Sequence, residues 1–202
     1  LAIIVTTAVA VLGGAGLYWK WQTRPVADTS ASELDSAFDA LDEGQFAEAR
    51  QIAERLRDES APHPRRLAAI AFVLGVCAVH EADRTYSSDK RDYYRLAARY
   101  LEEAQERGFP VDREAEGLFF LGKSLCLSGQ SMRSEPILQE ALTLNLGRRA
   151  EIRRLLAHGY LHRANPQFPA ALEQNQAFLA TPDLEGADRT QGLIQRAEIL
   201  LG

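Results

Sequence analysis

The spacing of apolar side chains predicts a chain built of helices from Ser32 to its C-terminal end. Apolar residues recur three and four positions apart, as in Leu34, Ala37, Phe38 and Leu41. This spacing places them on one face of an α-helix, whereas a half-buried strand would alternate apolar and polar residues. The sequence from Ser32 onward contains no stretch with that alternation, so we predict an all-α fold.

The N-terminal residues form a separate apolar segment. Residues 1–19 (LAIIVTTAVAVLGGAGLYW) carry no charged side chain, and Lys20, Trp21 and Arg24 follow them. As a helix this segment would span roughly 28 Å, close to the roughly 30 Å hydrocarbon core of a bilayer. Aromatic residues beside Lys20 are typical of a membrane interface. We therefore predict a transmembrane anchor helix over residues 1–21 and a polar linker over 22–31, with a cleavable signal peptide as the alternative interpretation.

Small residues mark a repeated unit of two helices. They stand in the first helix of successive units at Ala37, Gly75, Gly122 and Gly159, and in the second helix at Ala49, Ala97, Ser134 and Ala171. The two positions are 12 residues apart in three units and 22 apart in the second unit. The ten extra residues belong to a polar stretch, Asp83 to Asp92, between the two helices. We expect this insertion to lengthen one hairpin without disturbing the stack, while the small side chains let the helices approach closely.

The same residues give the chain a resemblance to the tetratricopeptide repeat (TPR) family. That family's pattern of a Leu-Gly pair in the first helix, an Ala in the second and a Pro after it is matched by Leu74, Gly75, Ala97, Leu101, Ala104 and Pro110. The third unit repeats it at Leu121, Gly122, Leu125, Gly129, Leu138 and Ala141, and the first unit carries its second half at Gly44, Phe46, Ala49, Ala53, Leu56 and Pro62.

The resemblance implies an α-solenoid of helix-turn-helix repeats over residues 32–202, with about four repeats and the first helix of a fifth. Counting onward from Ala171 places that last helix around Ala197, with Leu193 and Leu200 on the same face. A first helix without its partner cannot bury its apolar face. We therefore expect the sequence to be a fragment of a longer protein.

In this family the first helices line the concave wall of a superhelix, which binds extended or helical peptide segments. The resemblance implies an inward-facing, partner-binding set that is apolar at one end and cationic at the other: Phe38, Phe72, Val76, Val79, Phe119, Lys123, Arg153, Leu156, Tyr160 and Arg163. Chaperone-binding members hold a terminal carboxylate with Lys and Asn. The Asn residues here, Asn145, Asn165 and Asn175, do not fall at inward positions, so we do not expect that specificity.

Composition and motifs argue against catalysis and against nucleic acid as a partner. The 23 Lys and Arg residues are outnumbered by 28 Asp and Glu, and the formal net charge of -5 provides no basic field for phosphates. His158 and His162 share a helical face but lack the Glu of a zinc peptidase motif, and Cys77 with His80 supplies only two of four structural metal ligands. We predict a non-enzymatic protein with no cofactor or metal and no small-molecule substrate.

These features together predict a membrane-anchored scaffold that binds a partner peptide or protein on its concave face. We expect a single-pass protein of a bacterial inner membrane with the repeat domain outside the cytoplasm. One alternative is an accessory or regulatory region of a larger enzyme or signalling protein whose catalytic domain lies outside this sequence. Another is a structural subunit of a membrane complex.

Overall fold

The computed structural model describes residues 29–58, 64–144, 147–182 and 184–202. The chain divides into two compact units, 1–33 and 34–202, and of the first only the start of one helix is described. Every regular element in the described part is an α-helix: α2 (Thr29–Asp42), α3 (Phe46–Asp58), α4 (Pro64–Arg84), α5 (Lys90–Glu106), α6 (Glu114–Leu127), α7 (Ser131–Thr143), α8 (Arg149–Leu161), α9 (Phe168–Leu179) and α10 (Gly186–Leu201). The predicted all-α fold is confirmed, with α2 beginning three residues before Ser32.

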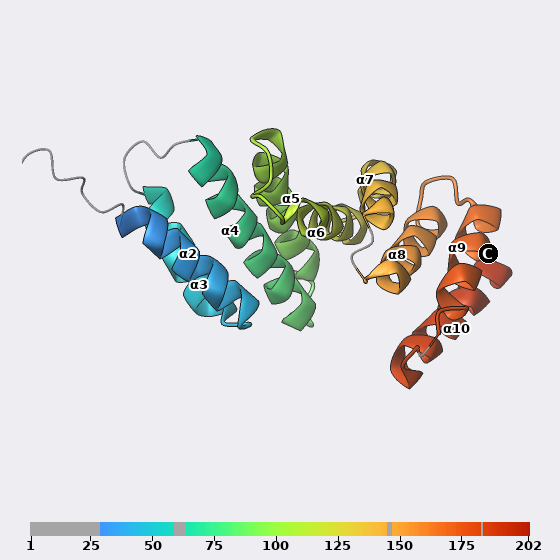
Figure 1. The fold of residues 1–202 in the computed structure, drawn as a ribbon. Coiled ribbons are helices and arrows are strands. Elements are labelled where there is room, and N and C mark those ends of the chain that lie inside the picture. Colours follow the sequence, from blue (N-terminus) through green and yellow to red (C-terminus); the bar gives the residue numbers. More distant parts are fainter. Residues whose placement is uncertain (1–28, 59–63, 145–146, 183) are drawn as a thin grey trace, which may run out of the picture. The chain divides into compact units, whose positions relative to one another are not determined.

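Residues 34–202 form successive helical hairpins (Figure 1). The most extensive packing joins α4 to α5, α6 to α7 and α8 to α9, and each second helix also packs on the first helix of the next pair. The first helices touch one another in the order α4, α6, α8 and α10. We call the side of the stack formed by these four helices the first-helix face.

Two of the hairpin turns depend on glycine in a left-handed conformation. Gly44 has φ 76° after α2, and Gly129 has φ 88° after α6. In each turn the next residue donates its backbone N–H to a carbonyl five positions back, Gln45 to Ala40 at 2.7 Å and Gln130 to Leu125 at 2.8 Å. This arrangement satisfies helix-end carbonyls and reverses the chain at once, which makes the two helices neighbours.

The predicted close approach at the small residues holds for two hairpins and is looser in a third. A Cβ placed on Gly75 would lie 2.6 Å from Cγ of Leu101, and one placed on Gly122 would lie 2.5 Å from Cδ2 of Leu138. At Gly159 the nearest atom is 3.7 Å from the same point, an ordinary contact distance. A side chain at either of the first two positions would therefore force the facing leucine to shift, because interiors are packed without spare volume.

A link across the first hairpins comes from the loop between α5 and α6. Arg113 in this loop donates from Nη1 to Oδ1 of Asp42 in α2 at 2.8 Å. It also pairs with Glu116 at 3.0 Å and lies over the ring of Phe38, 5.5 Å from its centroid. The loop is thereby tied to α2 as well as to the helix that follows it.

The last helix is held to the stack partly by a buried amide network. Nδ2 of Asn175 in α9 donates to the carbonyl oxygen of Gly192 at 2.9 Å and to Oε1 of Gln195 at 3.1 Å, while Nε2 of Gln195 donates to the carbonyl oxygen of Arg154. The predicted small residue of this helix, Ala197, is exposed, as are Leu193 and Leu200. The side of α10 that packs on α9 is instead that of Gly192, Gln195 and Ile199.

The predicted single-pass membrane localisation needs correction. Within the described ranges, no helix is both long enough and apolar enough to cross a bilayer. On this finding the placement in a bacterial inner membrane is wrong. The segments to which the sequence assigned the anchor, 1–21, and most of the linker, 22–31, lie outside the described residues.

Candidate functional site

The insertion lengthens the α4/α5 hairpin at its tip, as predicted. Helix α4 continues to Arg84, nine positions past Gly75, whereas α6 ends at Leu127, five positions past the equivalent Gly122. Helix α5 likewise begins earlier relative to its small residue than α7 does. The hairpin therefore extends beyond its neighbours, and its added turns contribute to two separate pockets.

The first pocket, which we call the cationic pocket, has a volume of about 480 Å³ and lies on the first-helix face. Its lining comes from both helices of the extended hairpin, from the tip between them and from α6, α8 and α10: Asp83, Ser88, Lys90, Arg91, Tyr94, Lys123, Leu127, Arg154 and Gln191. Four of these side chains are cationic and one is anionic. This pocket is thus a positively charged hollow on a protein whose net charge is -5.

A hydrogen-bonded network fixes one wall of the cationic pocket. The Asp83 carboxylate accepts from the Tyr94 hydroxyl and from Nζ of Lys123, the latter at 2.9 Å. Nζ of Lys123 also donates to Oε1 of Glu151 in α8 at 3.2 Å. Burial opposes ionisation of Asp83, but the hydrogen bonds from Tyr94 and Lys123 outweigh it and hold the pKa of Asp83 below its usual value. Lys123 of α6 therefore links three first helices, because its ion pairs reach α4 and α8.

The other cations of the pocket are not neutralised by carboxylates. Within the described residues Lys90 and Arg154 form no ion pair. Arg91 donates from Nε to the Ser128 carbonyl oxygen at 2.9 Å, which leaves its charge uncompensated. A neighbouring hollow of about 380 Å³ shares Arg154 and adds Arg148, Glu151 and Asp188. The excess of positive charge therefore lies in the cationic pocket and not in this neighbouring hollow.

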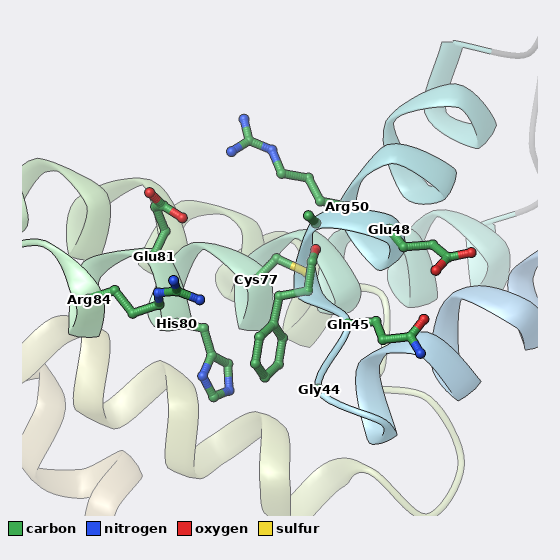
Figure 2. A pocket seen from close by; sticks show the side chains of 10 residues that line it. Gly44, Gln45, Glu48, Arg50, Cys77, His80, Glu81 and Arg84 are labelled. Carbon is green, nitrogen blue, oxygen red and sulfur yellow. The ribbon is translucent and has the colours of Figure 1, made fainter.

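The second pocket, which we call the Cys77 pocket, has a volume of about 570 Å³ and lies between the start of α3 and the C-terminal half of α4. Figure 2 shows His80, Glu81 and Arg84 of α4 on one side and Gln45 with Glu48 on the other. The Phe46 ring stacks on the His80 imidazole, with 3.6 Å between centroids.

Cys77 and His80, which line the Cys77 pocket, have the properties of buried packing groups and not of a catalytic pair. The Cys77 thiol donates to the Phe46 carbonyl oxygen at 3.4 Å, and burial raises its pKa to about 12. Burial also lowers the pKa of His80. A catalytic Cys–His pair requires the opposite shifts, because the reactive form is a thiolate beside an imidazolium. Cys77 and His80 are accordingly neutral packing groups at pH 7.

His158 of α8 and His162, the residue that follows this helix, also lie together. The His158 and His162 rings stack with 4.1 Å between centroids, and burial lowers the pKa of His158 to about 4. Across the ranges for which the structure gives positions, no group of three or more His, Cys, Asp and Glu side chains could hold a metal ion.

The ten partner-binding residues predicted from the sequence are divided by the structure between interior and surface. Six are buried in the core: Phe72, Val76, Val79, Phe119, Leu156 and Tyr160. Phe38 is partly buried, with 6.1 Å between its ring centroid and that of Phe72. Arg163 pairs with Glu135 of α7, which also accepts from the Tyr160 hydroxyl. Tyr160 and Arg163 are therefore turned toward a second helix, while Lys123 alone of the ten lines the cationic pocket.

Sequence reasoning missed the pocket residues that the insertion supplies. Lys90, Arg91 and Tyr94 follow the hairpin tip, and Arg154 is the immediate neighbour of the predicted Arg153. The available signal was the charge pattern of the Asp83 to Asp92 stretch, in which basic residues gather at the end that becomes the first turn of α5. From its polarity we predict only that this stretch lengthens a hairpin without disturbing the stack, although connecting segments often carry function.

Comparison with known proteins adds one likeness at the level of the fold. No family model and no curated protein matches the chain. A solved structure, that of a thermophilic TPR protein from Thermus thermophilus, superposes with a TM-score of 0.44 and 20% sequence identity. The match covers 86% of this chain and 100% of that one. The helical-hairpin repeat expected from the sequence is confirmed by the helix order and glycine contacts of the chain itself.

Proposed function

We propose that the chain is a protein-interaction scaffold that binds a segment of a partner protein along the first-helix face, across the cationic pocket. The observation that carries this proposal is the origin of the pocket lining. Its side chains come from α4, α5, α6, α8 and α10, so an occupant would touch several hairpins at once. A site spread along a stack of repeats suits an extended chain segment.

The partner-binding set named from the sequence enters this proposal in a modified form. Lys123 lines the pocket directly, whereas Arg153, next to Arg154 in α8, donates from Nη1 to Oε1 of Gln174 in α9 at 3.4 Å and does not line the pocket. The six buried members would contribute indirectly, because their packing fixes the positions of the helices that carry the charged side chains. Loss of such supporting contacts moves a site without removing any of its groups.

A binding role is favoured over a catalytic one by the state of the nucleophilic and basic groups. Burial raises the pKa of both thiols, Cys77 and Cys126, to about 12, so neither forms a useful fraction of thiolate at pH 7. The cationic pocket contains Lys and Arg groups suited to holding charge, and its Tyr94 hydroxyl is engaged by Asp83. Burial together with that hydrogen bond raises the pKa of Tyr94.

The proposal is tested by comparing two charge deletions. Arg154→Ser removes a pocket cation, alone or together with Lys90→Ser, while Arg99→Ser removes an exposed cation of α5 that does not line the pocket. Each immobilised variant is exposed to lysate of the source organism, and retained proteins are quantified by mass spectrometry. We expect proteins held by the wild type and by Arg99→Ser to be lost with Arg154→Ser at unchanged helicity. Retention of the same proteins by all variants would contradict the proposal.

A further inference from the structure

The balance of charge in the cationic pocket indicates what part of a partner it accepts. The lining cations Lys90, Arg91, Lys123 and Arg154 face one lining carboxylate, Asp83. Glu151 compensates part of the Lys123 charge from the adjoining hollow. The pocket therefore retains an excess of about two positive charges, by simple count of these groups at neutral pH.

An excess of this size matches a dianion better than a single carboxylate. A phosphorylated side chain carries about -1.5 to -2 charges at pH 7, and two neighbouring carboxylates carry the same charge on separate groups. Arg guanidinium groups bind phosphate and carboxylate oxygens through pairs of parallel hydrogen bonds. Arg154, which has no ion pair among the described residues, is free to form such a pair with an incoming group.

The pocket is also pre-organised around Lys123 and Arg91. The Asp83 carboxylate and the Glu151 carboxylate hold Lys123 between α4 and α8, with the Lys123 side chain only 12% exposed. Arg91 is anchored through its Nε to the carbonyl oxygen of Ser128, and its Nη2 lies against Gly129, where an added Cβ would meet it at 2.1 Å. Two of the four cations thus need little reordering when an anion enters, which reduces the entropic cost of binding.

We infer that the cationic pocket binds a dianionic oxygen group on the partner segment, supplied by a phosphorylated side chain or by a pair of adjacent carboxylates. This inference rests on the proposed function and specifies the chemistry of its partner. The site is a product of the insertion, because Lys90, Arg91 and Asp83 belong to the turns that lengthen the α4/α5 hairpin. The hairpins built on Gly122 and Gly159 lack those turns.

The test uses short fluorescein-labelled peptides of alanine and glycine that differ only at the centre. One carries a phosphoserine, one carries two adjacent glutamates, and one carries an unmodified serine. We expect anisotropy titrations to show binding of one or both anionic peptides at least about tenfold tighter than binding of the serine peptide. The tighter of the two anionic peptides identifies the source of the group. Equal affinity for all three peptides would overturn the inference.

Variants locate the binding and separate this inference from the proposed function. Arg154→Gln should weaken the anionic peptides by about tenfold, whereas the control Arg99→Gln should leave them unchanged. An equal loss in both variants would mean non-specific attraction and would overturn the inference. If lysate proteins depend on Arg154 while no anionic peptide is preferred, the scaffold proposal stands and the dianion inference fails. If neither depends on Arg154, both fail.

Discussion

Gly122→Ala and Gly159→Ala form a matched pair that tests the packing of the stack. Both glycines occupy the same position in successive hairpins, within α6 and α8. A methyl group at residue 122 would lie 2.5 Å from Cδ2 and 2.7 Å from Cγ of Leu138. At residue 159 the three nearest atoms lie at 3.7 to 3.8 Å. The first substitution overpacks a helix contact, and the second fills available space.

The magnitude follows from two opposing contributions to the free energy of unfolding. In either helix, replacing Gly with Ala gains about 1 kcal/mol of helix propensity. Overpacking a tight core contact costs about 1–3 kcal/mol, and Leu138 is fully buried, so its side chain cannot move into solvent. We therefore expect Gly159→Ala to stabilise the protein by about 1 kcal/mol. Gly122→Ala should be less stable than Gly159→Ala by about 1–3 kcal/mol, since the propensity gain cancels in the comparison.

Urea unfolding followed by far-ultraviolet circular dichroism measures this difference. For a domain of this size a change of about 1 kcal/mol also moves Tm by about 2–4 °C. Leu138→Ala supplies the control, because it removes the two atoms that the new methyl group would meet. In that background Gly122→Ala should become stabilising, which gives a favourable coupling in a double-mutant cycle. Equal unfolding midpoints for Gly122→Ala and Gly159→Ala would refute the predicted helix contact.

Three further outcomes follow from the polar and sulfur groups. Because the pKa of Asp83 is lowered in the folded state, its carboxylate stabilises the fold above its unfolded pKa of about 3.9 and loses this effect as pH falls through the folded pKa. Asp83→Asn should therefore lower the urea midpoint at pH 7, and its difference from wild type should shrink below about pH 4; a constant difference would contradict this. Both cysteine thiols have a pKa of about 12, so Ellman's reagent at pH 8 should react with neither until urea unfolds the chain, and rapid labelling of the native protein would show that the thiols are accessible. Asn175→Ala deprives the Gly192 carbonyl and Gln195 of their donor, and we expect a loss of about 1–3 kcal/mol together with faster hydrogen exchange confined to α10; unchanged exchange there would count against the amide network.

Periodicity and small residues predicted the fold because both report on local packing. The offsets among Gly75, Gly122 and Gly159 located the first helices, and the longer offset to Ala97 located the lengthened hairpin. They could not distinguish a tight contact from a loose one. Leu138 lies against Gly122, whereas small groups of Cys126, Ser131 and Ser134 surround Gly159. That difference depends on side chains from other helices.

The candidate site was predicted less well because helical spacing does not distinguish the core from the solvent side of a first helix. Phe119 and Lys123 are four positions apart, yet Phe119 is fully buried and Lys123 borders the cationic pocket. In a stack, a first helix contacts neighbours on several sides, and α6 is buried at most positions from Gly117 to Cys126. Changing Phe119 would therefore disturb the core, while the charges of Lys90 and Arg154 offer cleaner tests of binding.

The packing of each helix on near neighbours affects how the chain folds as it is synthesised. From α3 onward, helices in the described part pack only on helices one or two places away along the chain. Contacts of this kind close short loops, so each hairpin can form soon after it leaves the ribosome at about 5–20 residues per second. The Asp42–Arg113 ion pair is different, because its partners are 71 residues apart. It can close only after α5 and Arg113 have emerged, so it adds a late contact between hairpins that the packing of α3 on α4 has already joined.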